Sequence, residues 1–98
     1  MKTIFRKDKL LLRYSNLAAT ENKQEFLLLG YPLHLSPDEA ELVHLLQRKR
    51  TLGVTRIPNT SANSLAVRVY SINQKAKRVS DRRLIIFEDG AYRLNPYL

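Results

Sequence analysis

The feature that most constrains this chain is an amphipathic helical pattern followed at once by a hairpin signal. Apolar residues recur at four- and three-residue intervals that place them on one side of a helix. They are Leu65, Val69, Ile72, Ala76 and Val79. A strand-like run over residues 83–87 then leads into Asp89-Gly90, a strong signal for a two-residue hairpin turn. The pattern predicts a helix over residues 64–80, anchored in a core, and a hairpin whose returning strand is 91–94.

The opposite face of this predicted helix is polar and basic. The side chains that we expect to point away from the core are Val67, Tyr70, Ser71, Gln74, Lys77 and Arg78. A short helix with a buried back and a hydrogen-bonding, cationic front has the chemistry to enter the major groove of double-stranded DNA. An ordinary solvated helix face is the alternative interpretation.

Composition narrows the classes of partner and site. The 98 residues include 17 Lys and Arg against 9 Asp and Glu, a net charge of +8, so polyanions are natural partners, although a basic surface can also serve solubility alone. The length fits one domain, 1–98, with a single core. The chain has no cysteine, which excludes disulfides and thiolate metal sites and fits a cytoplasmic protein. The sequence contains neither a signal-peptide pattern nor an apolar run of the ~20 residues that span a bilayer.

The first 35 residues are predicted to form a small antiparallel sheet. Residues 9–14 and 24–29 are apolar runs of strand length, and the polar stretch 15–23 separates them. Gly30-Tyr31-Pro32 provides a turn signal. Residues 33–35 then alternate as a short strand would.

The first helix has a clear beginning. Ser36-Pro37-Asp38-Glu39 combines a hydroxyl N-cap, a proline at the first helical position and a glutamate that completes a capping box. Its apolar stripe consists of Leu42, Val43, Leu45 and Leu46. The closing triplet Arg48-Lys49-Arg50 suits the negative end of a helix dipole and is equally compatible with phosphate contacts.

Residues 51–63 read as a loop between the two helices. Val54 to Ile57 are compatible with one helical turn, and Pro58 argues against a longer helix. Either Ser64 or Ser61 can cap the second helix, which is predicted to end near Ser80-Asp81.

In this order, the predicted elements resemble the winged-helix DNA-binding domain of OmpR/PhoB-type response regulators. Leu35-Ser36-Pro37-Asp38-Glu39 is similar to the family phrase Leu-Thr-x-x-Glu that opens the first helix. Residues 67–75 are similar in their apolar framework to the recognition-helix pattern Val-x-Val/Ile-x-x-Leu-Arg-x-Lys. Residues 88–93 match the wing phrase Arg-Gly-x-Gly-Tyr-Arg at Tyr92 and Arg93. The resemblance implies an α+β winged helix-turn-helix with an N-terminal antiparallel sheet over 1–35, helices over 36–81 and a C-terminal β-hairpin wing over 82–98.

Three departures from the family pattern accompany this resemblance. Asn73 stands where the family usually has arginine. Glu88 and Asp89 place acidic groups at the wing, where phosphate would repel them. The stretch 54–64 is about ten residues shorter than the family's second helix and following loop, which by resemblance contacts RNA polymerase. No receiver domain precedes the sheet, so we expect a stand-alone domain.

The residue types assign roles to the candidate site. Arginine and glutamine side chains pair with base edges, whereas lysine and the tyrosine hydroxyl more often contact phosphates. We therefore expect Arg68, Ser71, Gln74 and Lys75 near bases or the edge of the groove, and Tyr70, Lys77 and Arg78 on phosphates. The full set of candidate DNA-binding residues is Ser64, Val67, Arg68, Tyr70, Ser71, Gln74, Lys75, Lys77, Arg78 and Arg93.

Several of these residues have structural alternatives. An N-cap role alone would explain Ser64, and an exposed Tyr70 suits a protein interface as well as DNA. Arg82 and Arg83 are either phosphate contacts or a solvated pair.

Catalysis is not expected. His34 and His44 lack spaced partners for a metal site, adjacent Glu88-Asp89 in a turn would diverge, and the three glycines form no phosphate loop. We expect no cofactor and no small-molecule substrate.

The sequence thus predicts sequence-specific binding to double-stranded DNA by a small transcriptional regulator of the bacterial cytoplasm. One winged domain presents few base contacts, so a homodimer or a partner transcription protein is expected. The main alternative is a winged-helix protein-interaction module in which Tyr70 and the acidic wing bind a protein. RNA binding is a third possibility, with less support because stacking aromatics on the sheet are not evident.

Overall fold

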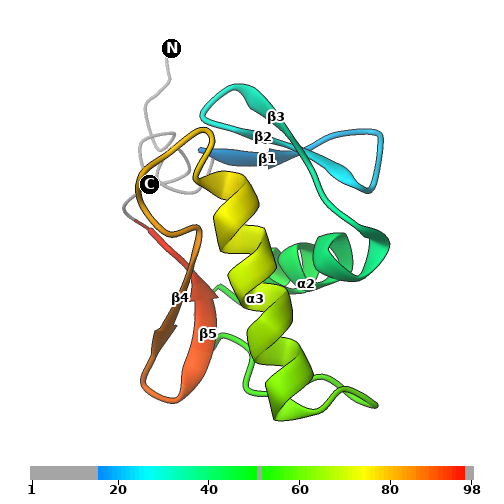
Figure 1. Cartoon of the computed structure of the whole chain (residues 1–98), viewed down its shortest axis with the longest axis vertical. Coiled ribbons are helices and arrows are strands. Elements are labelled where there is room, and N and C mark those ends of the chain that lie inside the picture. Colours follow the sequence, from blue (N-terminus) through cyan, green and yellow to red (C-terminus); the bar gives the residue numbers. More distant parts are fainter. Residues whose placement is uncertain (1–15, 51, 97–98) are drawn as a thin grey trace.

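The computed structural model describes residues 16–50 and 52–96, which form a small α+β domain (Figure 1). A three-stranded antiparallel sheet and a separate two-stranded C-terminal hairpin accompany two helices, α2 and α3. The sheet, in the order β1-β2-β3, contains β1 (Leu17–Ala19), β2 (Glu25–Leu28) and β3 (Tyr31–His34). The helices are α2 (Pro37–Arg48) and α3 (Ala62–Ala76), and the hairpin pairs β4 (Ile85–Glu88) with β5 (Ala91–Leu94).

The N-terminal sheet differs from the sequence prediction at β1. The stretch 15–23, expected to be only a polar connection, contains this strand, because Leu17 is buried and pairs with Leu28 of β2. The polar turn is confined to the residues after β1, where the Thr20 hydroxyl bonds the backbone oxygens of Asn22 and Glu25. The predicted strand 9–14 lies outside the described residues.

The turn between β2 and β3 also moves by one residue. Leu29 and Gly30, at φ 55° and 86°, occupy its two central positions, as a two-residue hairpin turn of the primed type requires. Pro32, which the sequence placed in the turn, pairs with Leu27 inside β3. Proline is tolerated there because β3 is an edge strand of its sheet.

The beginning of α2 confirms the predicted capping box. The Ser36 hydroxyl accepts the Glu39 N–H, and the Glu39 carboxylate accepts the Ser36 N–H at 2.9 Å. Leu42, Val43 and Leu46 of its apolar stripe are fully buried, and Leu45 packs beside them.

The core joins both sheets to the two helices. α3 buries the residues that its spacing selected, Leu65, Val69, Ile72 and Ala76, and Val79 packs against the same core. These side chains meet apolar residues of the sheet, α2 and the hairpin. Burial of this stripe fixes which face of α3 remains exposed.

The ends of α3 correct two boundaries. Of the two caps that the sequence allowed, Ser61 is the N-cap, because its hydroxyl accepts the Ser64 N–H at 3.0 Å, and the helix therefore begins at Ala62 and not at residue 64. The helix ends at Ala76, four residues before the predicted end near Ser80. Its last turn tightens there, and the Ala76 carbonyl accepts the N–H groups of both Val79 and Ser80.

The loop between the helices contains a β-bridge at Val54, where the sequence allowed at most one helical turn. Val54 exchanges backbone hydrogen bonds of 2.9 and 2.8 Å with Tyr92 of β5. This bridge ties the loop between the helices to the C-terminal hairpin. Within the described residues 52–61, no helix is present.

The C-terminal hairpin turns where the sequence predicted. Asp89 and Gly90 have φ 55° and 79°, the left-handed conformation that this two-residue turn needs at both positions. β4 begins at Ile85 and not at Arg83, while Leu84 before it is buried in the core.

Substitution of Gly53 tests how closely the loop between the helices packs on the C-terminal hairpin. A Cβ there would lie 2.7 Å from the backbone oxygen of Tyr92, and its φ is +75°. Gly30 has a similar φ of +86° with no atom within 4 Å of a Cβ, so Gly30→Ala is the matched control. We expect Gly30→Ala to lower the free energy of unfolding by about 1 kcal/mol and Gly53→Ala by about 2 kcal/mol or more in urea titrations. Equal losses of unfolding free energy in the two variants would contradict the close approach of the Gly53 backbone to Tyr92.

Candidate nucleic-acid interface

α3 lies between α2 and the C-terminal hairpin, so each side of the helix has a different neighbour (Figure 1). Its buried stripe faces the core. One flank meets α2 and the other meets β4. The remaining face is open to a partner and contains most of the residues that the sequence selected.

The contact between α3 and α2 is organised by the Glu39 carboxylate. Ser71 donates its hydroxyl to Oε2 at 2.6 Å, and the Lys75 ammonium donates to Oε1 at 2.5 Å. The Ser36 N–H of the capping box also reaches Oε1. A single nearly buried carboxylate therefore closes the first turn of α2 and fastens α3 to it.

These partners determine how Glu39 ionises. Burial of the carboxylate would by itself raise its pKa. The hydrogen bonds from Lys75, Ser71 and the Ser36 backbone, together with the charge of Lys75, outweigh burial and lower the pKa from 4.5 to about 2. Glu39 is therefore a carboxylate at neutral pH, and α3 is held by a charged acceptor.

Three of the candidate residues contact the acidic side chains in the first turn of α2, Asp38 and Glu39. Ser71 does not point outward as predicted, because its hydroxyl is bonded to Glu39. Lys75 is bound to the same carboxylate. Arg68 lies 3.8 Å from Asp38, and its side chain is only 16% exposed. These residues, expected near bases, lie on the flank of α3 that faces α2.

The other flank of α3 is fastened to the hairpin by Asn73. Its side-chain amide donates to the Ile85 oxygen at 3.0 Å and accepts the Ile85 N–H at 2.8 Å. The Asn73 side chain thus bonds both backbone groups of Ile85, the first residue of β4, in the way that the backbone of a neighbouring strand would. The departure from the arginine of the family pattern has a structural consequence, because Asn73 positions the hairpin beside α3.

The open face of α3 retains six of the ten candidates, all of them exposed. These are Ser64, Val67, Tyr70, Gln74, Lys77 and Arg78. Ser64 is an outer residue of the capped first turn, because its N–H is occupied by Ser61. The Gln74 amide donates to the Tyr70 hydroxyl, which orients both side chains one helical turn apart.

Arg93 is directed toward its own hairpin turn. Its guanidinium lies 3.6 Å from the Glu88 carboxylate and 3.8 Å from that of Asp89, and it also donates to the Glu88 backbone oxygen. The acidic tip is therefore partly neutralised from within the hairpin. Arg93 acts here as a partner of the tip carboxylates.

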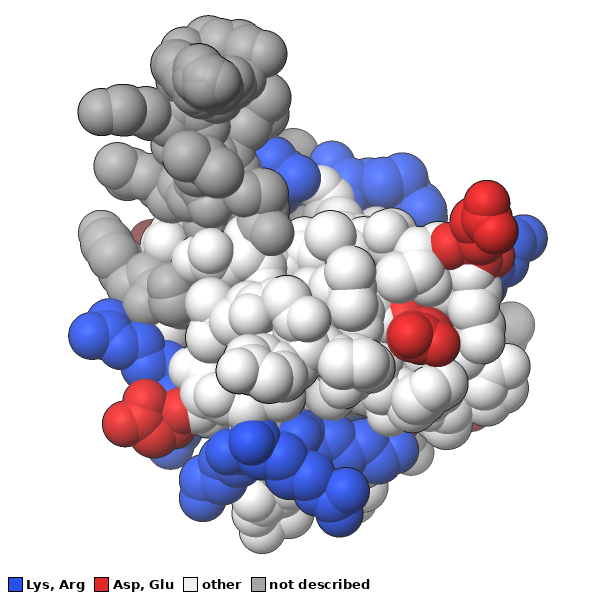
Figure 2. All heavy atoms as spheres, turned by 90° about the horizontal axis from the view of Figure 1, so that it is seen from above, with Lys and Arg blue, Asp and Glu red and all other residues white. Residues whose placement is uncertain are grey.

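Basic side chains gather at the C-terminal end of α3. Lys77, Arg78, Arg82 and Arg83 are all exposed, with Asp81 among them. Figure 2 shows Lys and Arg side chains along the lower edge of the view, the side that faces the viewer in Figure 1, where α3 lies. The open face of α3 thus continues into a cationic surface that suits phosphates.

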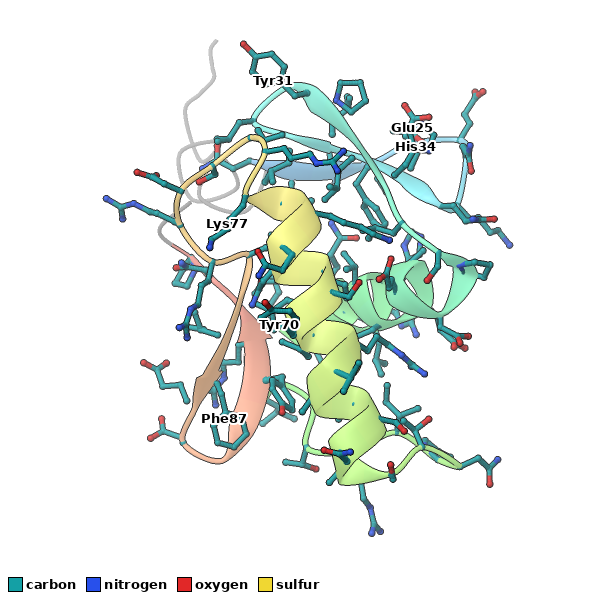
Figure 3. All side chains as sticks on the ribbon, viewed as in Figure 1. Glu25, Tyr31, His34, Tyr70, Lys77 and Phe87 are labelled. Carbon is teal, nitrogen blue, oxygen red and sulfur yellow. The ribbon has the colours of Figure 1, made fainter. Side chains whose placement is uncertain are left out.

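A groove of about 330 Å³ separates α3 from the hairpin. Tyr70 and Lys77 line it from the helix side, and Phe87 of β4 lines it from the other side (Figure 3). Phe87 was not among the candidates from the sequence. The sequence placed Phe87 only at the end of an apolar strand, and the structure shows that its side chain is 63% exposed.

The two histidines have local partners. His44 shares a 2.9 Å hydrogen bond with the Lys23 oxygen and packs on the Phe26 ring. His34 lies 3.4 Å from the Glu25 carboxylate on the neighbouring strand. Across residues 16–50 and 52–96, no three His, Asp or Glu side chains gather as metal ligands. No helix in these ranges is long and apolar enough to cross a membrane.

We compared the chain with family models, with curated proteins and with solved structures, and none of them matches it. We therefore infer the function from the geometry and chemistry of α3 and its neighbours.

Removing the Glu39 charge should change how stability depends on pH. In the unfolded chain the Glu39 carboxylate takes up a proton near pH 4.5, whereas in the folded protein it stays ionised until the pH falls to about 2. The carboxylate thus stabilises the fold above about pH 5, and this contribution, up to about 3 kcal/mol, is lost as the pH falls toward 2. We expect Glu39→Gln to be less stable at pH 6 and to show a shallower loss of stability on acidification, measured by urea unfolding across this range.

Glu41→Gln is the matched control, because Glu41 is an exposed glutamate of the same helix. It should retain the wild-type dependence on pH. A Glu39→Gln variant that lost stability as steeply as the wild type would contradict the role of Glu39 as the charged acceptor.

Proposed function

We propose that this protein is a winged-helix domain that binds double-stranded DNA, with α3 as the recognition helix and the C-terminal hairpin as the wing. The placement of α3 is the main observation that supports this proposal. This helix is clamped on one flank by Glu39 and on the other by Asn73, while its open face presents polar and cationic side chains. A rigid helix with such a face is what reading of the major groove requires.

The loop between the helices supports a shortened version of the winged-helix arrangement. The Val54 bridge adds a third backbone segment beside β5, so the wing is fixed both to this loop and to α3. Because residues 52–61 contain no helix, α3 would be oriented by α2 and the wing, without the second helix of a helix-turn-helix.

The contacts made by the candidates divide the proposed interface into reading and positioning residues. Val67, Tyr70 and Gln74 occupy the middle of the open face, where base edges would lie, and an apolar side chain such as valine can contact the thymine methyl group. Lys77, Arg78 and Arg83 would contact phosphates. Arg68, Ser71 and Lys75 would hold α3 in place through α2.

We propose a transcriptional regulator as the biological context, acting as a dimer on two half-sites or with a partner transcription protein, because four exposed residues on α3 and two directly after it read only a short site. A protein-interaction module is the second candidate function. The acidic wing tip favours it, since Glu88 and Asp89 are exposed beside Arg93 and repel phosphate.

Two arginine substitutions on neighbouring parts of the chain test the proposed interface. Arg78→Ala and Arg68→Ala remove the same charge, but Arg78 is exposed whereas Arg68 is covered and faces Asp38. We expect Arg78→Ala to weaken duplex binding and to reduce the salt slope of log K by about 1. Arg68→Ala should change both quantities less. The duplex would be selected from a random library and titrated by fluorescence anisotropy at about 50 and 200 mM salt.

Gln74→Ala tests base reading in the same assay. We expect the selected sequence to lose about 1–3 kcal/mol of its advantage over random duplex, because a bidentate contact to adenine is removed. Failure to enrich any sequence, together with binding that ignores salt, would contradict the proposed function and favour the protein-interaction module.

A further inference from the structure

The groove between α3 and the wing combines two kinds of surface. Its floor is apolar and includes Val69 and Ile85, while aromatic rings stand along its sides. One end is lined by Lys77, Arg82 and Arg83, with Asp81 as the acidic member. A ligand that fits this groove has a flat or apolar part joined to an anionic part.

The aromatic rings of the groove are exposed and held in place. Phe87 packs edge to face on Tyr92, with 4.9 Å between the ring centroids. Tyr70 is oriented by the hydrogen bond from Gln74. Tyr70 and Phe87 remain 65% and 63% exposed, so their outer surfaces are preorganised and available for stacking.

From these two observations we propose that the groove binds unpaired nucleotides of single-stranded DNA. Bases would stack on Phe87 and Tyr70, and the phosphates would lie toward the three cations. Stacking of bases on aromatic side chains beside a basic track is the general way in which single strands are held. The choice of DNA rests on the proposed function, whereas the stacking site is independent of it.

The acidic hairpin tip determines toward which end of the groove the phosphates of a bound strand would lie. Glu88 and Asp89 lie at the end of the hairpin, and Arg93 neutralises them only in part. Phosphates would therefore run toward the Lys77 end and leave the groove before the tip. The groove shares Tyr70, Gln74 and Lys77 with the open face of α3, so a bound single strand would differ from a bound duplex in its contact with Phe87 on the hairpin side.

A tryptophan reporter tests the stacking directly. The chain has no tryptophan, so Phe87→Trp introduces a single indole at the proposed platform and preserves an aromatic ring. We expect a short oligothymidylate to quench its fluorescence. Phe87→Ala should weaken oligothymidylate binding about tenfold or more and leave duplex binding nearly unchanged.

Tyr31 provides the matched control. It is 64% exposed, nearly the same as Phe87, but lies in β3 of the N-terminal sheet, away from the groove (Figure 3). Tyr31→Trp should not be quenched, and Tyr31→Ala should bind oligothymidylate as the wild type does. An abasic oligonucleotide with the same phosphates should quench F87W much less.

Several results would overturn the proposal. They are an unquenched F87W under conditions where oligothymidylate is bound, equal losses from Phe87→Ala and Tyr31→Ala, and full quenching by the abasic strand. Stronger quenching by oligouridylate, or by a short glutamate-leucine peptide without phosphate, would assign the groove to RNA or to an acidic protein segment instead. The duplex titration separates the two proposals. Duplex binding without quenching of F87W by oligothymidylate would overturn only the single-strand site in the groove. Quenching without duplex binding would overturn only the proposed function.

Discussion

The hydrogen-bonded ion pair between Glu39 and Lys75 is the interaction on which the arrangement of the two helices depends. The same carboxylate completes the capping box of α2 and accepts the Ser71 hydroxyl of α3. A carboxylate removed from water is costly unless it is paired and hydrogen-bonded, and here every partner comes from one of the two helix segments that must meet. Together with burial of the apolar stripe of α3, the cluster therefore helps to determine how α3 is rotated against α2 and which residues form the open face.

Asn73 performs the corresponding task on the other flank. Its amide satisfies both backbone groups of Ile85, so the hairpin is attached to α3 by a pair of hydrogen bonds in addition to the core. The Val54 bridge to Tyr92 attaches the hairpin a second time. The two hydrogen bonds of Asn73 thus connect α3 and β4, which form the two sides of the groove.

Local signals in the sequence predicted much of the fold. The capping box at Ser36, the apolar spacing along α3 and the Asp89-Gly90 turn were all confirmed, because each depends on residues close together in the chain. β1 and the Val54 bridge were missed. Both depend on partners distant in sequence, Leu28 and Tyr92, and a three-residue strand or a single bridge leaves little periodicity to detect.

The same distinction separates the candidate site into two parts. Helical geometry alone identified Val67, Tyr70 and Gln74 as outward-facing residues. It could not show that Arg68, Ser71 and Lys75 are engaged by α2, because Asp38 and Glu39 lie some thirty residues earlier in the chain. Their type suggested nucleic-acid contacts, which stay a prediction, and their position adds contacts with the first turn of α2. The exposure of Phe87 was hidden for a similar reason, since residues 84–87 form a continuous apolar run that does not reveal where the core ends.

The central claim is that the open face of α3 and the basic residues after it meet double-stranded DNA. Amide chemical-shift mapping by NMR during a titration with duplex DNA tests it most directly. The account predicts shifts concentrated at Val67, Tyr70, Gln74 and residues 77–83, with the exposed residues Leu27 and Tyr31 of the N-terminal sheet unaffected. Shifts centred on that sheet or on the Glu88-Asp89 tip, or no shifts at all, would contradict it.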